Sequence, residues 1–366
     1  MHLADIAPSI FASLGLPDSR GRNSFDSSPA GRECLFIIDG LGASAAKEYA
    51  EHIPTIRNFK QFASAQTAFP STTATSLATL MTGELPGAHG MLGYTVRVPR
   101  SGGRILNALK WDERVDPEVW QPVPTLFERG NAAGIEVSHI AANRYEKSGF
   151  TRAALRGAHY RGANELSDLV KETKNALKKS PAFAYVYANE LDVAGHSDGV
   201  GSAKWLAALS YVDQIAASLV AHLPKGTRIW ISADHGMVNA QEKIIMGNGN
   251  PLLTGVSEVA GETRARHLYL SESHVHEPDA VAHLMRDFLG DRGDVMTQAE
   301  AIEAGLFGAT VTQDARDRMG DIILIARDSV VFIDKAREKQ ETSMIGHHGG
   351  LTEIEKLVPL AMHQIN

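Results

Sequence analysis

The sequence predicts an α/β protein with a doubly wound, mostly parallel central sheet flanked by helices. Three apolar runs of strand length support this prediction, over residues 34–40, 182–188 and 228–232. Runs that stay apolar along their length are typical of strands buried on both faces of a parallel sheet. Helical patterns separate them, most clearly over residues 202–223, where apolar side chains recur every three or four positions. This alternation of strand and helix favours a doubly wound core.

The remaining elements are predicted in order along the chain. The pattern indicates a strand over residues 136–141 and helices over residues 3–15, 43–50, 123–130 and 164–179. Residues 95–120 have no clear period, and we expect them to be an excursion over the surface. Residues 239–341 are expected to form a smaller appended α/β region, with strands at 267–270 and 321–325 and helices near 277–289 and 298–305. We expect residues 1–366 to form one domain that includes both segments.

Composition and charge narrow the class of partner. Lys and Arg total 36 and Asp and Glu total 43, which gives a net charge of −7. This balance argues against nucleic-acid wrapping or an anionic membrane surface, but it permits a small phosphorylated ligand, since a bound metal ion can outweigh the local field. The oligomeric state is left open.

Location is indicated by three features of the sequence. The single cysteine, Cys34, excludes an internal disulfide. The N-terminal residues lack the basic start and apolar core of a signal peptide. No stretch reaches the roughly 18 apolar residues that a membrane span needs. A cytoplasmic location is therefore expected, with no membrane partner.

Residues 66–83 are the segment around which the chain is organised. Pro70 favours an extended lead-in, and the pattern turns helical from Ala74, with Gly83 placed to end the helix. Several hydroxyl groups therefore lie at a helix N-terminus, where unpaired N–H groups and the helix dipole stabilise an anion. A threonine here is either a helix cap or a nucleophile that attacks phosphorus.

Acidic and imidazole side chains follow each of the three apolar runs. In a parallel sheet the carboxyl ends of the strands meet at one edge, so these side chains are expected to share a crevice. A loop near the C-terminus brings a further histidine pair, His347 and His348, between glycines. The candidate ligands are Asp39, Asp192, His196, Asp234, His235 and His348.

Such a cluster of buried acids and imidazoles requires cations to neutralise it. Mixed carboxylate and imidazole ligation suits Zn²⁺, with Mn²⁺ or Fe as alternatives. With Thr73 the candidate ligands suffice for two divalent metal ions, and paired ions can clamp the attacking and leaving oxygens of a phosphoryl transfer.

These motifs resemble the nucleotide pyrophosphatase/phosphodiesterase family of the alkaline phosphatase superfamily. The resembling pieces are Asp39-Gly40, the Thr-rich segment that ends at Gly83, residues 192–196, residues 233–236 and residues 346–349. The resemblance implies an alkaline-phosphatase-like catalytic domain over nearly the whole chain. It also implies one metal held by Asp39, Thr73, Asp234 and His235, and a second held by Asp192, His196 and His348.

The family spacing implies Thr73 as the nucleophile, with the adjacent Thr72 as the alternative. Several family members have Asn three residues further on as a donor to a phosphate oxygen, and this chain has Ser76 there. Ser76 is therefore the expected substrate-binding residue.

The resulting expectation is a hydrolase of phosphodiester or pyrophosphate bonds in nucleotide-type substrates, acting through a covalent phosphothreonine. None of the matched motifs contains an arginine that would bind the two negative charges of a phosphate monoester, which favours a diester or pyrophosphate substrate. The alternatives are a phosphomonoesterase or a phosphonate hydrolase of the same superfamily, and, from another class, a non-catalytic metal-binding protein.

Overall fold

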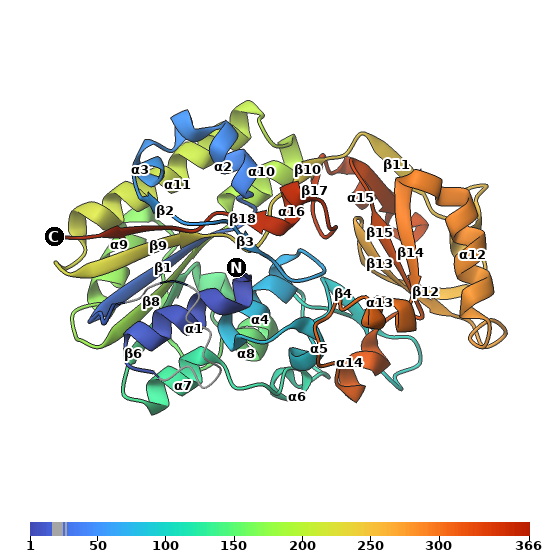
Figure 1. The fold of residues 1–366 in the computed structure, drawn as a ribbon, viewed down its shortest axis with the longest axis horizontal. Helices are drawn as coiled ribbons and strands as arrows, with labels where there is room; N and C mark the ends of the chain where they lie inside the picture. The colour runs from blue at the N-terminus through green and yellow to red at the C-terminus, as the bar shows by residue number, and fades with distance from the viewer. Residues whose placement is uncertain (17–24, 26–27) are drawn as a thin grey trace.

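A seven-stranded sheet forms the centre of the larger lobe in Figure 1. The computed structural model describes residues 1–16, 25 and 28–366. Within them the strands lie in the order β2 (Lys60–Gln61), β19 (Ala361–Gln364), β9 (Thr227–Ser232), β1 (Arg32–Ile38), β8 (Ala182–Ala188), β6 (Glu136–Ala141) and β7 (His159–Gly162). The strands from β9 to β7 run parallel, while β19 pairs antiparallel with β9. The predicted mostly parallel sheet is confirmed.

Helices cover both faces of this sheet (Figure 1). One face carries α2 (Ala43–Glu48), α3 (Pro54–Arg57), α9 (Leu166–Ala176), α10 (Glu190–Asp198) and α11 (Ala203–His222). The other carries α1 (Leu3–Ser13), α4 (Thr73–Thr82), α7 (Leu126–Ala132) and α8 (Gly149–Ala154). Strand β1 is buried between these layers: Cys34 to Ile38 have no exposed surface. A strand covered on both faces must be apolar throughout, which is why this run was recognisable. None of the helices in the described residues has the length and apolar character that a membrane crossing requires.

The smaller lobe, orange to red in Figure 1, is built around a four-stranded antiparallel sheet. Its strands are β12 (Val256–Glu262), β13 (Ala265–Leu270), β15 (Ile322–Ala326) and β14 (Gly293–Thr297). Helices α12 (Pro278–Leu289), α13 (Gln298–Glu303) and α15 (Glu338–Ser343) accompany them, with the parallel pair β11 (Glu242–Ile245) and β16 (Val330–Ile333). Leu268, Met285 and Phe332 belong to a hydrophobic cluster separate from the main core.

Residues 95–120 contain a short hairpin and one helical turn. Strand β4 (Thr95–Arg97) pairs antiparallel with β5 (Ile105–Asn107), and α6 (Pro117–Trp120) follows. Val96, Leu106 and Trp120 are buried in the main core, so these side chains anchor the segment. Thr95 also donates a hydrogen bond to the carbonyl of Gly261 in β12 (2.7 Å), which ties the hairpin to the smaller lobe.

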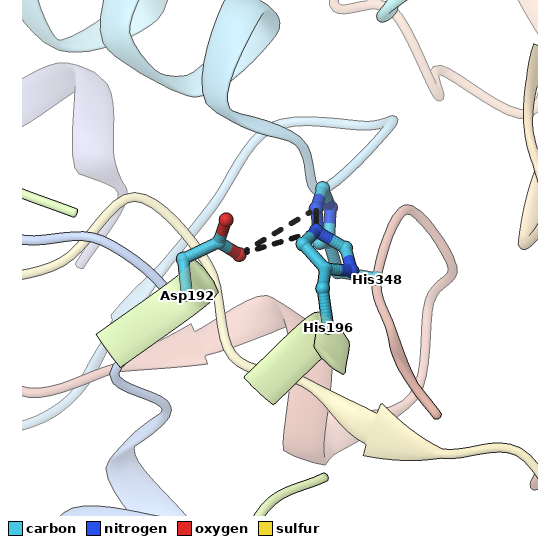
Figure 2. A group of neighbouring side chains, drawn as sticks. All are labelled: Asp192, His196 and His348. Carbon is cyan, nitrogen blue, oxygen red and sulfur yellow. Dashed lines mark hydrogen bonds and ion pairs between the residues drawn. The ribbon is translucent and has the colours of Figure 1, made fainter. Parts of the chain in front are cut away.

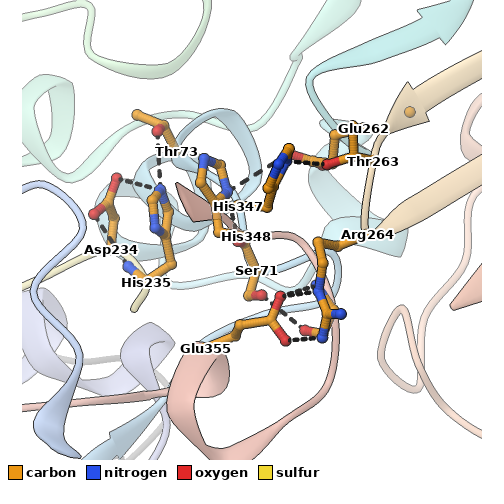
Figure 3. Close-up of polar contacts among 12 residues, drawn as sticks. Ser71, Thr73, Asp234, His235, Glu262, Thr263, Arg264, His347, His348 and Glu355 are labelled. Carbon is orange, nitrogen blue, oxygen red and sulfur yellow. Dashed lines mark hydrogen bonds and ion pairs between the residues drawn. The ribbon is translucent and has the colours of Figure 1, made fainter. Parts of the chain in front are cut away.

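A buried ion pair joins the two lobes directly behind the C-terminal histidine loop (Figure 3). Arg264 lies between β12 and β13, and Glu355 lies on α16 (Glu353–Lys356); neither side chain is exposed. Two hydrogen bonds connect them, at 2.9 and 2.7 Å. Glu355 also accepts the backbone N–H of Gly350 (2.8 Å), so it holds the loop that carries His348.

We therefore predict that Glu355→Ala destabilises the protein by about 3–5 kcal/mol, because it leaves the Arg264 cation buried without its partner. The matched control is Glu353→Ala on the same helix, where the side chain is 77% exposed, and a loss of at most about 0.5 kcal/mol is expected. Urea unfolding of both variants measures the difference. Equal losses would contradict this role of the ion pair.

Candidate active site

The first cluster joins the ends of two neighbouring strands. Asp39 directly follows β1, and Asp234 and His235 lie two and three residues beyond β9. All three are almost completely buried. The Nε2 atom of His235 lies 3.4 Å from Oδ1 of Asp39 and 3.6 Å from Oδ2 of Asp234. The strand ends thus bring together the first group of residues that the sequence singled out.

Each carboxylate of this cluster has one oxygen that accepts hydrogen bonds and one oxygen without a hydrogen-bond partner in the described residues. Tyr187 donates to Oδ2 of Asp39, and the N–H groups of Gly40 and His235 donate to Oδ1 of Asp234 (3.2 and 3.0 Å). Within the described residues, Oδ1 of Asp39 and Oδ2 of Asp234 have no hydrogen-bond partner. Burial, reinforced by the neighbouring acids, raises the pKa of Asp39, and burial also raises the pKa of Asp234. Two buried carboxylates with free oxygens facing each other need a cation.

The second cluster contains Asp192 and His196 from α10 and His348 from the C-terminal loop (Figure 2). Nδ1 of His196 donates to the carbonyl of Gly346 (2.8 Å), and Nδ1 of His348 donates to that of Ser71 (3.1 Å). Both Nε2 atoms then carry lone pairs, yet they lie 3.2 Å apart. Oδ1 of Asp192 lies 3.4 Å from Nε2 of His196. Lone pairs converging at this distance repel each other unless a cation lies between them.

The two clusters adjoin each other. The rings of His235 and His348 stack with their centroids 3.7 Å apart. Gly40 has a φ of +78°, and a Cβ atom there would lie 3.2 Å from the Cα of Asp192, so glycine allows α10 to approach β1 closely. Within the described residues, the clusters Asp39/Asp234/His235 and Asp192/His196/His348 each have ligand atoms close enough to hold one ion.

The loop that carries His348 is fixed from two sides. Ser71 donates its N–H to the carbonyl of Gly349 (3.2 Å) and its hydroxyl to that of Gly350 (2.7 Å). His347, the neighbour, points elsewhere: its Nδ1 contacts the Thr263 hydroxyl at 2.7 Å (Figure 3). His348, not His347, therefore meets Asp192 and His196.

Thr73 begins helix α4 beside the first cluster. Its Oγ1 lies 3.2 Å from Nε2 of His235, as Figure 3 shows. Thr72 occupies the N-cap position, but its side chain makes no capping hydrogen bond. The first-turn N–H groups therefore remain available to an anion. Between the two readings of these hydroxyls, helix cap or reactive group, the geometry favours the second.

A cavity of about 330 Å³ opens from this centre toward the smaller lobe. Thr72, Thr73 and the second cluster form part of its lining, together with Tyr94, Asn107, Leu109, Lys110, Gly261, Glu262, Thr263, Arg337, Gln340, Glu341 and Met344. Ser76, the predicted phosphate donor, is fully buried in α4 and is not among the lining residues. Its hydroxyl has no hydrogen-bond partner among the described residues, and a substrate contact for Ser76 stays a prediction.

Glu262 is a site residue that the sequence reading missed. Its side chain is 10% exposed, and Oε2 lies 3.7 Å from Nδ1 of His348. Burial raises the pKa of this carboxyl to about 8, although a hydrogen bond from Thr72 and the charge of Arg266 lower it. Glu262 ends an irregular strand of the smaller lobe, so no motif pointed to it. Tyr187 was also missed, because it reads as one more core residue of β8.

The model of one family, type I phosphodiesterase / nucleotide pyrophosphatase, matches residues 34–351. The chain therefore belongs to this family, and the resemblance expected from the motifs is confirmed.

Two curated proteins match part of the chain. A phosphopentomutase from Tolumonas auensis is 30% identical over 154 residues, and an uncharacterised pyrophosphatase/phosphodiesterase from Schizosaccharomyces pombe is 26% identical over 180 residues. These matches cover 40% and 46% of this chain but only 35% and 37% of the two relatives' own length.

Two solved structures share the fold over most of the chain. Murine ectonucleotide pyrophosphatase / phosphodiesterase 5 has a TM-score of 0.71 at 17% identity, covering 90% of this chain and 87% of that one. Phosphonoacetate hydrolase from Sinorhizobium meliloti, in complex with phosphonoformate, has a TM-score of 0.70 at 17% identity, covering 92% and 91%. At these identities the likeness shows the fold alone.

We predict a pH dependence of stability in the metal-free protein that Glu262 controls. The folded protein holds a proton on Glu262 up to about pH 8, whereas the unfolded chain releases it near pH 4.5. The contribution is therefore present at low pH and is lost as the pH rises through this window. Between pH 5.5 and pH 8, wild type should lose on the order of 2 kcal/mol more than Glu262→Gln in urea unfolding. Parallel losses would show that Glu262 titrates normally.

Proposed function

We propose that this protein is a metal-dependent hydrolase that cleaves phosphodiester or pyrophosphate bonds in nucleotide-type substrates through a covalent phosphothreonine. One observation carries the proposal: the Thr73 hydroxyl lies 3.2 Å from His235 at an uncapped helix N-terminus, beside two acid–imidazole clusters. A nucleophile and an anion site beside two cation sites are the parts that phosphoryl transfer needs.

The donor set fits two divalent ions, and we propose Zn²⁺, with Mn²⁺ or Fe as alternatives. Asp39, Asp234 and His235 would hold one ion together with Thr73, and the cluster Asp192/His196/His348 would hold the other. The unpaired oxygens of Asp39, Asp192 and Asp234 are atoms that such ions would satisfy. When bound, the ions supply positive charge that favours the ionised forms of the Thr73 hydroxyl and of a water molecule.

The chain's own groups then account for two displacements. Thr73, as the alkoxide, attacks phosphorus while the bond to the leaving oxygen breaks, and that oxygen departs with the electron pair and takes a proton from water. The first-turn N–H groups of α4 stabilise the non-bridging oxygens. Water then attacks the phosphothreonine, the bond to Thr73 breaks, and the proton that water loses restores the hydroxyl or enters solvent.

The comparisons support this choice of substrate class. The family description names phosphodiesterase and nucleotide pyrophosphatase. A structure of an inactive form of the murine relative, with a TM-score of 0.69, is a complex with AMP. The second candidate function is phosphonate hydrolysis, favoured by the likeness to phosphonoacetate hydrolase. Rates with bis-p-nitrophenyl phosphate, p-nitrophenyl phosphate and phosphonoacetate, each with added metal, separate the diesterase, the monoesterase and the phosphonate hydrolase.

We predict that Thr73→Ala lowers kcat for bis-p-nitrophenyl phosphate by at least about 1,000-fold, because it removes the hydroxyl group that would form the covalent intermediate. Thr73→Ser, which keeps a hydroxyl group, should retain measurable turnover. The neighbouring Thr72→Ala is the matched control and should stay within about tenfold of wild type. Loss of activity in Thr72→Ala alone would assign the nucleophile to Thr72, and full activity in Thr73→Ala would refute a phosphothreonine.

Metal stoichiometry gives a separate prediction. After dialysis against Zn²⁺, wild type should hold two ions per chain, and Asp192→Asn should hold one, because it removes the carboxylate of the second cluster. Asp198→Asn is the control: it lies on the same helix and pairs with Lys204 instead. Elemental analysis of the three proteins measures the counts. Two ions in Asp192→Asn would remove Asp192 from the ligand set.

A further inference from the structure

Part of the cavity beside Thr73 is lined by two segments that lie outside the central sheet. One is the end of β5 and the residues after it, which contribute Asn107, Leu109 and Lys110. The other is the segment after β16 in the smaller lobe, which contributes Arg337 and residues of α15. None of these residues belongs to the two acid–imidazole clusters. What they present to the cavity is therefore separate from metal binding.

Arg337 lines this cavity, and one nitrogen of its guanidinium has no hydrogen-bond partner among the described residues. Its Nε atom lies 3.1 Å from Oδ2 of Asp334 and 3.3 Å from Oε1 of Glu341, which fix the guanidinium. Its Nη2 atom is buried and, within the described residues, has no hydrogen-bond partner. Buried N–H groups are almost always paired, so this residue of the cavity wall keeps a donor for an acceptor that the described residues do not supply.

Two further donors line the same cavity from the β5 side. Oδ1 of Asn107 accepts the backbone N–H groups of Leu109 and Lys110, both at 2.9 Å. The amide NH₂ of Asn107 is thus left to donate, and the Lys110 backbone is held in place. The side chain of Lys110 is exposed and has no ion pair in the part of the chain that the structure describes.

The acids of the cavity do not cancel these donors. Glu341 is engaged by Arg266 and by the backbone N–H of Asp334 (2.8 Å), and Glu262 lies beside His348. The two positive charges of Arg266 and Arg337 balance the two negative charges of Glu341 and Asp334. Arg337 therefore contributes a hydrogen-bond donor, and Lys110 contributes the net positive charge. Donors of this kind bind an oxygen-rich anion.

We propose that Asn107, Lys110 and Arg337 bind a second anionic group of the substrate, a phosphate or a carboxylate, remote from the phosphorus that Thr73 attacks. This inference rests on the proposed function and adds to it the residues that select the substrate. The cavity of about 330 Å³ is at the small end of ligand sites, so both anionic groups belong to one small molecule or to one end of a larger one. Substrates without the second anion lose these contacts.

The test compares three substrates that differ in this group. ATP carries two phosphate groups besides the one that Thr73 would attack, whereas the p-nitrophenyl ester of thymidine 5′-monophosphate and bis-p-nitrophenyl phosphate carry only the reacting phosphate and release p-nitrophenolate. With metal-loaded protein, Arg337→Gln and Lys110→Gln should each lower kcat/KM for ATP at least tenfold. The same variants should change kcat/KM for the two p-nitrophenyl esters by less than twofold.

The control variant is Lys335→Gln, an exposed cation two residues before Arg337 that does not line the cavity; it should leave all rates unchanged. Arg337→Lys, which keeps a donor, should recover part of the ATP rate. Lys110 is exposed, so its variant tests the proposal even if Arg337→Gln unfolds, which thermal melting would reveal. Phosphonoacetate as a competitive inhibitor distinguishes a carboxylate: its inhibition constant should rise in both variants if this group is the second anion.

The failures of the two proposals are distinguishable. Suppose that wild type cleaves the p-nitrophenyl esters. If Arg337→Gln and Lys110→Gln then lose ATP hydrolysis and ester hydrolysis equally, or lose neither, the anion site is refuted and the proposed function stands. If wild type cleaves none of the three substrates, or if Thr73→Ala cleaves them as well as wild type, the proposed function itself is refuted.

Discussion

Three carboxylates, two of them buried, and three imidazoles meet at one edge of the central sheet, and their mutual repulsion is the constraint on which the rest of the structure depends. Oδ1 of Asp39, Oδ1 of Asp192 and Oδ2 of Asp234 have no hydrogen-bond partner among the described residues. Leaving such groups unpaired would cost more free energy than a typical domain can spare. The proposed cations would remove this cost, and the surrounding structure holds these side chains in place.

Several elements of the fold contribute to this positioning. The parallel register of β1 with β8 and β9 places Asp39 and Asp234 side by side. Ser71 ties the start of α4 to the loop that carries His348, so Thr73 and His348 are held together. The Arg264–Glu355 pair then connects this loop to the smaller lobe. A movement of the smaller lobe would therefore shift His348 and the wall of the cavity beside Thr73.

The core sheet and the two clusters could be predicted from the sequence, and the cavity wall could not. Strand β1 is apolar because both of its faces are covered, and Asp39 follows it directly, so pattern and position agree. Glu262 and Arg337 lie in the smaller lobe, where short antiparallel strands give weak patterns, and only the folded chain brings them beside Thr73. The substrate contact of Ser76 came from the family resemblance and stays a prediction: its side chain is fully buried, and its hydroxyl has no hydrogen-bond partner among the described residues.

The most direct test of the central claim is a crystal structure of the zinc-loaded protein with anomalous diffraction data collected at the zinc absorption edge. We expect two anomalous peaks about 3.5–4 Å apart, one among Asp39, Asp234 and His235 beside Thr73, and one among Asp192, His196 and His348. Absence of both peaks, or peaks bound only by other residues, would contradict the account, because the buried acids and imidazoles would then be stable without cations.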